Sequence, residues 1–451
     1  MPVTPKRVVN AWAMYDWANS AYNLVITSTI FPMYYVAITT KKNTDSNVYF
    51  FGHQFINTSL SNYCVAAAYL IIVILSPILS SIADYKGNKK AFMQFFCYIG
   101  GLSCCGLYFL APQLGIYGHS NGFDYGVMEM GMICFMLAAI GYCGSLVFYN
   151  AYLPEIAEKA DQDKISAKGF AYGYVGSVVA QLICLVVVLK PTLFGITDPF
   201  LPSRISFIIV GVWWIGFAQI PFKILPKGIP VKQTNQYSIW KIGFVKLKQV
   251  WKQVKQMPVL KRYLRSFFFY SMGLQTVMLV AAIYGSKELE LSSQTLIVTI
   301  LIIQLVAILG SYLMSKLSST YGNLYVLASC ILIWIIICIA GYFIQKKSDV
   351  QFYILGGVVG LVMGGIQSLS RSTYSKLMPV TKDTASFFSY YDVTEKLAIV
   401  IGMFSFGFIE EIAKTMRNSV LILAIYFFIA FILMIPTIVK HNNYSTGSVQ
   451  N

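Results

Sequence analysis

The amino-acid sequence predicts an all-α membrane protein with twelve transmembrane helices in two pseudo-symmetric six-helix halves. The composition is too apolar for water, twelve apolar stretches are long enough to cross a bilayer, and the longest loop divides them six and six. Hydrophobic residues make up 57% of the 451 positions and charged residues 12%, whereas soluble domains have about 25% charged residues. The composition therefore excludes a soluble domain and a disordered chain.

The twelve stretches are apolar over the length of about 20 residues that a bilayer core requires. They are continuously apolar, unlike the alternating segments of a β-barrel, and a helix satisfies its backbone groups without water. Asp16 interrupts the first stretch, so we interpret it as a retained helix rather than a cleaved signal peptide. The expected spans are 12–38, 58–83, 91–112, 126–151, 168–190, 204–225, 263–285, 294–317, 324–344, 350–375, 386–410 and 418–439.

The net charge of +16 is concentrated in one loop. Residues 223–265 contain eleven Lys and Arg and no acidic residue. With both termini in the cytoplasm, 24 basic residues lie in inner segments and 9 in outer ones, as the positive-inside rule requires. We therefore expect a multi-pass protein of the inner cell membrane with cytoplasmic termini, and not a nucleic-acid-binding protein.

This loop also sets the expected domain organisation. Residues 1–225 are expected to form the N-terminal half, 226–262 a cytoplasmic basic amphipathic linker, and 263–451 the C-terminal half. Weak similarity between the turns after spans 2 and 8, and between the ends of spans 4 and 10, supports duplication of a six-helix unit.

The linker has the pattern of an amphipathic helix. Such a helix would lie on an anionic membrane surface or against the bundle; a surface linker that only enforces topology is the alternative. The apolar positions are Trp240, Phe244, Leu247, Trp251 and Val254, and the lysines of the other side are Lys241, Lys248, Lys252 and Lys255.

Polar residues inside the spans are the candidate functional residues, because a charge at a helix centre costs about 2.5–3.5 kcal/mol. Span 1 has five of them within about 100° of arc at helical periodicity, which predicts a stripe that lines a lumen. The alternative for Asp16 is a place near the helix N-terminus, where the dipole favours an acid; it does not apply to the deeper Asn23 and Thr27. The stripe consists of Asp16, Asn19, Ser20, Asn23 and Thr27.

Span 11 has a charged cluster of Asp392, Glu395 and Lys396. Two acids beside one base leave one negative charge, which suits a proton carrier or a contact to the solute. Alternatively, Asp392 and Lys396 pair on their own helix at spacing i,i+4. Further cavity candidates are Ser271 and Gln275 in span 7, and Gln367 and Arg371 in span 10.

Other kinds of site find no support in the sequence. The nine cysteines lie in or at the edges of apolar spans, and the three histidines are scattered, so we expect no metal and no cofactor. A membrane enzyme would need a nucleophile with a base or a metal cluster, and an ATP-driven pump would need a Gly-Lys phosphate loop. We therefore do not expect an enzyme.

Several motifs resemble one branch of the major facilitator superfamily, the branch of the fungal vacuolar amino-acid effluxer linked to autophagy and its bacterial relatives. The most specific is Tyr-Asp-Trp-Ala-Asn-Ser-Ala-Tyr at 15–22. The resemblance to the family also includes the runs at 149–154, 169–176 and 364–372. The resemblance implies a twelve-helix secondary transporter that works by alternating access on a small polar solute such as an amino acid, with efflux as the expected direction.

The resemblance also implies gating residues. Asp84, Gly87 and Lys89 match the superfamily's loop motif after span 2, in which the acid is a conformational latch that faces the N-terminus of span 11. Ser80 and Tyr85 depart from that motif. Relatives commonly have an acid in span 7 where this chain has Met272, so the acid has moved, on this interpretation, to Asp392 or Glu395 in span 11.

We therefore expect a transporter whose partners are a small-molecule solute, the lipid bilayer and, as a hypothesis based on Asp16, Asp392 and Glu395, protons. A monomer is expected. A transport-inactive receptor or scaffold of the same fold is the alternative, although polar Asn23 and Thr27 favour a wet cavity.

Overall fold

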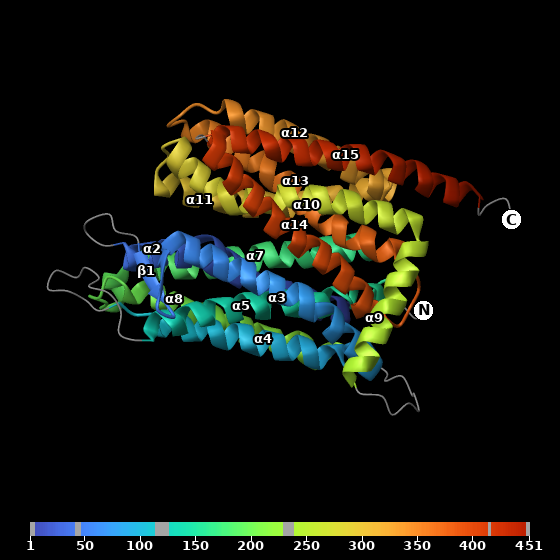
Figure 1. Ribbon diagram of the computed structural model, residues 1–451, viewed down its shortest axis with the longest axis horizontal. Helices are drawn as coiled ribbons and strands as arrows, with labels where there is room; N and C mark the ends of the chain where they lie inside the picture. Colours follow the sequence, from blue (N-terminus) through green and yellow to red (C-terminus); the bar gives the residue numbers. More distant parts are fainter. Residues whose placement is uncertain (1–4, 41–46, 113–125, 229–238, 414–415, 448–451) are drawn as a thin grey trace.

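The computed structural model describes residues 5–40, 47–112, 126–228, 239–413 and 416–447, without the side chains of 239–243, 407, 409–413 and 444–447. It is a bundle of long helices in two groups that lie side by side (Figure 1). The first group (blue to green) comes from the N-terminal part of the chain and the second (yellow to red) from the C-terminal part.

The N-terminal group consists of six membrane-length segments with short additions. A β-hairpin of β1 (Asn47–Phe50) and β2 (His53–Ile56), which the sequence did not predict, precedes the second segment. The helices are α1 (Lys6–Ala21), the π-helix η1 (Tyr22–Thr29), α2 (Ile30–Thr39), α3 (Asn57–Lys86), α4 (Lys89–Gly106), η2 (Leu107–Phe109), α5 (Val127–Asn150), α6 (Leu153–Ile156), α7 (Gln162–Leu189), η3 (Pro191–Phe194) and α8 (Leu201–Ile224).

The C-terminal group follows α9 (Ile239–Gln256), which lies across one end of the bundle (Figure 1). Eleven helical segments of the described chain are long and apolar enough to cross a membrane. The twelfth expected span is α14, a helix of 30 residues that contains the three charged residues of the predicted cluster. The helices of this group are α10 (Pro258–Ile283), η4 (Tyr284–Glu288), α11 (Ser293–Tyr321), α12 (Asn323–Phe343), α13 (Asp349–Leu377), α14 (Thr384–Ala413) and α15 (Met416–Gly447).

One local prediction was wrong: the regular helix geometry on which the polar stripe of span 1 was based. The stripe assumed one regular α-helix, but residues 22–29 form a π-helix, whose i→i+5 hydrogen bonds shift the later side chains around the axis. The Thr29 hydroxyl donates to the Leu24 carbonyl five residues earlier, at 2.8 Å. The arc calculated for a regular helix therefore does not apply beyond residue 22; Asn19, before the π-helix, is buried, and Asn23, within it, is exposed.

The linker helix α9 lies against the bundle, one of the two positions that the sequence left open. Val250 and Val254 are buried against the bundle, but Phe244 and Trp251 are 56% and 46% exposed. The helix therefore packs against the bundle on a face that only partly coincides with the predicted apolar stripe. The side chains of Trp240 and Lys241, also part of that prediction, lie outside the described residues.

Close helix contacts depend on the glycines of α13. A Cβ atom added at Gly364 would lie 2.1 Å from the carbonyl oxygen of Ala307 on α11, far inside van der Waals contact. At Gly357, about two turns earlier on the same helix, a Cβ atom would meet no described atom within 4 Å. The small residues at the contact let the two backbones approach, as is common in membrane helix pairs.

Gly364→Ala should therefore destabilise the bundle, whereas Gly357→Ala should not. Overpacking costs about 1–3 kcal/mol, while alanine in an unobstructed helix position gains up to about 1 kcal/mol over glycine. Thermal unfolding of the purified protein in detergent measures both variants against the parent chain. Equal unfolding temperatures for the two variants would contradict this account of the α11–α13 contact.

Candidate functional site

A buried ion pair joins the two groups of helices. Nη1 of Arg371 on α13 lies 3.2 Å from Oδ2 of Asp16 on α1, and the hydroxyl of Tyr149 donates to the same oxygen at 2.6 Å. Arg371 is 2% exposed and Asp16 6%. The two residues are 355 positions apart in the chain, so the pair is a tertiary contact that local sequence cannot reveal.

The rest of the Arg371 guanidinium is bound by α5 and α7. It donates to the Ser166 hydroxyl at 3.0 Å, to the Ser166 carbonyl at 2.9 Å and to Oδ1 of Asn150 at 3.3 Å. The rings of Trp12, Tyr149 and Phe170 lie 4.8, 5.4 and 4.3 Å from its carbon Cζ, within the range of cation–π attraction. Burial of this charge is therefore compensated by hydrogen bonds and by aromatic faces.

Gly169 on α7 provides the space for this pair. A Cβ atom there would lie 2.7 Å from Oδ2 of Asp16 and 2.8 Å from Nη2 of Arg371. The glycine run 169–176, which the sequence analysis named for the family resemblance, begins at this position. Its first member packs against the charged pair itself.

Neither sequence interpretation of Asp16 describes its position. The carboxylate lies about 15 Å along the helix from Lys6, at 1.5 Å per residue, and it contacts Arg371 rather than an open lumen or the helix dipole. The sequence reasoning also missed Tyr149, Asn150 and Ser166 as partners. The first two belong to a motif quoted for the family resemblance, which was the available signal.

Asp84, at the end of α3, lies against the beginning of α14. Its carboxylate accepts from the backbone N–H groups of Ala385 at 3.2 Å and Ser386 at 2.7 Å, and from the Ser386 hydroxyl at 2.6 Å. The first N–H groups of a helix have no intrahelical partner and carry partial positive charge. The carboxylate therefore caps a helix of the other group.

The short turn after Asp84 brings a second charged side chain to the same place. Gly87 ends α3 with a left-handed φ of 60°, which favours glycine. Lys89, two residues on, donates to the Thr384 hydroxyl at 2.7 Å and forms an ion pair with Glu155. Thr384 in turn donates to Glu155 at 2.9 Å.

A third polar connection was not predicted. Asp163 on α7 forms an ion pair with Lys376 on α13. It also accepts from the Asn323 amide at 2.6 Å and from the Ser318 hydroxyl at 3.0 Å. In the sequence, Asp163 precedes the expected span 5, which begins at residue 168. It therefore lies outside the apolar stretches in which polar residues were taken as candidates.

These three connections lie toward the same end of the bundle. They involve the ends of α3, α5, α11 and α13 and the beginnings of α4, α7, α12 and α14. Consecutive membrane-length helices alternate in direction, so these termini share the end at which α1 begins, where α9 also lies (Figure 1). We call this set of contacts the polar gate; the structure is closed at this end.

The charged cluster of α14 lies apart from the polar gate. Nζ of Lys396 is 2.8 Å from Glu395 and 3.5 Å from Asp392, so Lys396 pairs with both acids of its own helix. Oε1 of Glu395 accepts from the Gln275 amide on α10 at 3.3 Å. Asp392 and Lys396 are buried, and in the described part of the chain Oδ2 of Asp392 has no hydrogen-bond partner.

This cluster faces the N-terminal group of helices. Nζ of Lys396 lies 5.9 Å from the centre of the Tyr69 ring on α3. The cluster carries one net negative charge when all three groups are ionised. The cluster lies on α14 where this helix packs against α3, at the contact between the two groups.

The remaining candidates are dispersed. Gln367 on α13 accepts from the Tyr174 hydroxyl of α7 at 2.7 Å, which adds a deeper contact between the groups. Ser20 donates to Asn19 at 3.4 Å. Ser271 is buried, Thr27 is half-buried and Asn23 is exposed.

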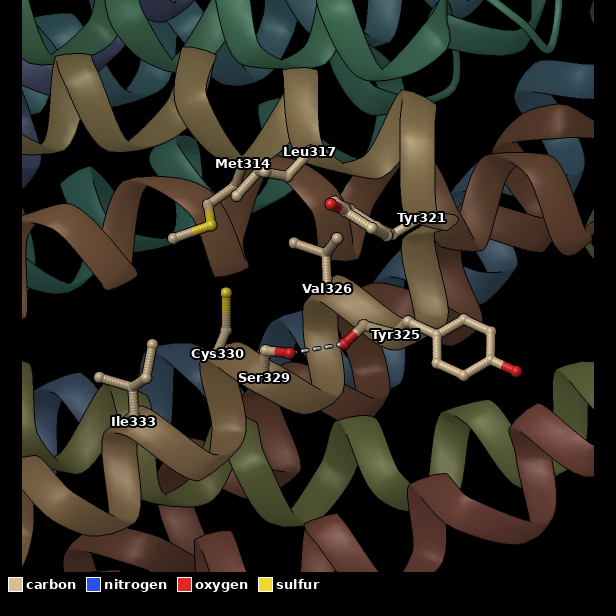
Figure 2. Close-up of a pocket in the computed structure, with 8 residues that line it drawn as sticks. All are labelled: Met314, Leu317, Tyr321, Tyr325, Val326, Ser329, Cys330 and Ile333. Carbon is tan, nitrogen blue, oxygen red and sulfur yellow. Dashed lines mark hydrogen bonds between the residues drawn. The ribbon is translucent and has the colours of Figure 1, made fainter.

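An apolar groove of about 550 Å³ lies between α11 and α12 (Figure 2). Met314, Leu317, Val326 and Cys330 point into it from the two helices, and no charged residue lines it. The side-chain hydroxyls that line the groove are those of Ser329, Tyr321 and Tyr325. The groove is therefore not a candidate solute site.

Comparison with known proteins places these features in a family. The family described as vacuole effluxer Atg22-like matches residues 4–444. The chain belongs to the Atg22-like vacuole effluxer family. It is 30% identical over 427 residues to the uncharacterized MFS-type transporter YxiO of Bacillus subtilis, covering 94% of this chain and 93% of that protein. Autophagy-related protein 22 of Kluyveromyces lactis is 24% identical, with 94% and 92% covered.

Solved transporters share the fold. A variant of the E. coli fucose:proton symporter FucP has a TM-score of 0.65 at 14% identity, with 96% of this chain and 98% of that chain covered. The proton:xylose symporter XylE has a TM-score of 0.67 at 13% identity, with 95% and 94% covered. The predicted family and the twelve-helix major facilitator fold are thus confirmed, and the chain is a multi-pass membrane transporter rather than an enzyme.

Proposed function

We propose that this protein is a secondary active transporter that moves a small polar solute by alternating access. The observation that carries the proposal is the polar gate, because reversible polar contacts between two helix groups at one end suit a structure that opens there. We further propose that residues 1–225 and 263–451 move as the two halves, joined by the linker 226–262.

The polar gate can open only if water replaces the hydrogen bonds and ion pairs between its residues. Removal of one partner from a buried ion pair costs about 3–5 kcal/mol because the other charge is left unpaired, so loss of either Arg371 or Asp16 would disfavour the closed arrangement. In the open arrangement both groups would be hydrated, which returns part of this free energy. The resulting balance lets a bound solute shift the equilibrium by its differential affinity for the two states.

The proposed solute is an amino acid or a solute of similar chemistry. Lys396 would pair with a carboxylate, and Asp392 or Glu395 with an ammonium group, so the cluster can receive both ends of a zwitterion. Gln275, bonded to Glu395, adds a neutral polar contact. The family description as an effluxer supports export as the direction.

Proton coupling is proposed to run through the same cluster. Protonation of one acid would leave Lys396 balanced by a single carboxylate, which removes the net negative charge from a buried site. Asp392 is the stronger candidate because its second oxygen lacks a protein partner in the described structure. Asp16, which the sequence also suggested, is already paired with Arg371 and is assigned to gating.

For orientation we propose cytoplasmic termini in the inner cell membrane, based on the distribution of Lys and Arg. In that orientation the structure is closed toward the cytoplasm. We propose that the transporter works as a monomer.

Solute flux in proteoliposomes tests the coupling. A counterflow assay over a panel of amino acids first identifies a transported solute; no exchange of any solute would favour a transport-inactive receptor. Flux of that solute should then increase with an imposed pH gradient, and Asp392→Asn with Glu395→Gln should remove this dependence. Asp161→Asn, at an exposed position, is the control. Gradient-independent flux in the parent chain would contradict coupling to protons.

Asp16→Asn should express normally and lose transport. A loss of about 3 kcal/mol from the closed state would change the ratio of closed to open molecules about 100-fold, so the cycle would stall in the open state. Expression is followed by size-exclusion chromatography and transport by the same flux assay. Parent rates of flux in this variant would show that the ion pair has no role in gating.

A further inference from the structure

The helix α9 has an outer surface that the described elements leave largely exposed; of its residues, Trp251 also stacks on Tyr390 of α14. On its inner side Val250 and Val254 are buried. On its outer side Phe244 and Trp251 are substantially exposed, and they lie beside the exposed Lys248, Lys252 and Lys255. We call these five residues the outer surface of α9.

The inner side of α9 is attached to the polar gate. Nζ of Lys246 lies 2.5 Å from Oδ1 of Asp383, the residue before α14. The Tyr390 hydroxyl on α14 donates to the Leu247 carbonyl at 2.9 Å, and the rings of Trp251 and Tyr390 stack at 5.7 Å. The first turn of α14, which Asp84 caps, is therefore held between α3 and α9.

The composition of the outer surface identifies its partner. Residues 223–265 carry eleven basic residues and no acid, so their charge favours an anionic partner. Aromatic side chains next to lysines on a helix at the end of a membrane bundle match the interface of a bilayer, where rings insert among headgroups and ammonium groups meet phosphates. An acidic soluble protein would satisfy the lysines but not the exposed rings.

We propose that the outer surface of α9 binds anionic lipid headgroups, and that this binding stabilises the closed polar gate through α9's contacts to α14. Lipid contact fixes α9 at the bundle. A fixed α9 retains the Lys246–Asp383 pair and the Tyr390 contacts, and these hold the first turn of α14 against Asp84. Membrane composition would thus regulate the opening of the gate.

Hydrogen–deuterium exchange of the full chain in nanodiscs tests the proposal. One set of discs contains only phosphatidylcholine, and the other has part of it replaced by phosphatidylglycerol. Peptides from α9 and from the first turns of α14 should exchange more slowly in the anionic discs. Lys248→Gln with Lys252→Gln should remove most of this difference. Lys159→Gln with Lys316→Gln, which changes the charge equally at exposed positions, should retain it.

Equal exchange of α9 in both lipids, or a lipid effect that persists in the Lys248→Gln and Lys252→Gln variant, would overturn lipid binding by this surface. Slower exchange of α9 without slower exchange of α14 would overturn the connection to the gate. The readout is exchange rather than flux, so the result does not depend on which solute is transported.

Discussion

The buried ion pair between Arg371 and Asp16 is the interaction on which the arrangement of the two halves depends. Two charges removed from water are tolerated only if their remaining hydrogen-bonding groups are satisfied. This requirement accounts for the surrounding residues: Ser166 and Asn150 accept from the guanidinium, Tyr149 donates to the carboxylate, and the absent side chain of Gly169 leaves room for both. Water would replace these protein partners if the two halves separated at this end.

The other connections of the polar gate apply the same principle at helix ends. Asp84 accepts from backbone N–H groups at the start of α14. Asp163 contacts the side chains of Ser318 and Lys376, near the ends of α11 and α13, and of Asn323 at the start of α12. A helix terminus offers unpaired backbone groups that a side chain or water can satisfy equally well. Contacts at termini can therefore break without disrupting the helices themselves. The glycine-rich contact of α13 with α11, by contrast, lies within the C-terminal half and is suited to permanent packing.

The sequence predicted what depends on local composition and failed where distant segments meet. Each expected span corresponds to a helical segment because the bilayer thickness fixes the apolar length. The charged cluster of α14 was found because its members are neighbours on one helix. The partner of Asp16 was not found, because nothing within span 1 indicates a residue on α13. The π-helix after Ala21 was missed since i→i+5 bonding leaves no periodic signal in eight residues. The sequence left open whether the apolar stripe of α9 meets the bundle or the membrane, because an aromatic residue satisfies a membrane interface as well as a protein core.

If the Arg371–Asp16 pair keeps the polar gate closed, its loss must separate the two halves at this end, and a distance measurement across the gate tests this directly. Spin labels at Lys159→Cys and Lys382→Cys, exposed positions in the two halves, report the separation after the half-buried Cys105 and Cys134 are replaced by alanine. We expect mainly short distances in this chain and a shift to longer distances when Asp16→Asn or Arg371→Gln is added. An unchanged distance distribution in both variants would contradict the role of the pair in closing the gate.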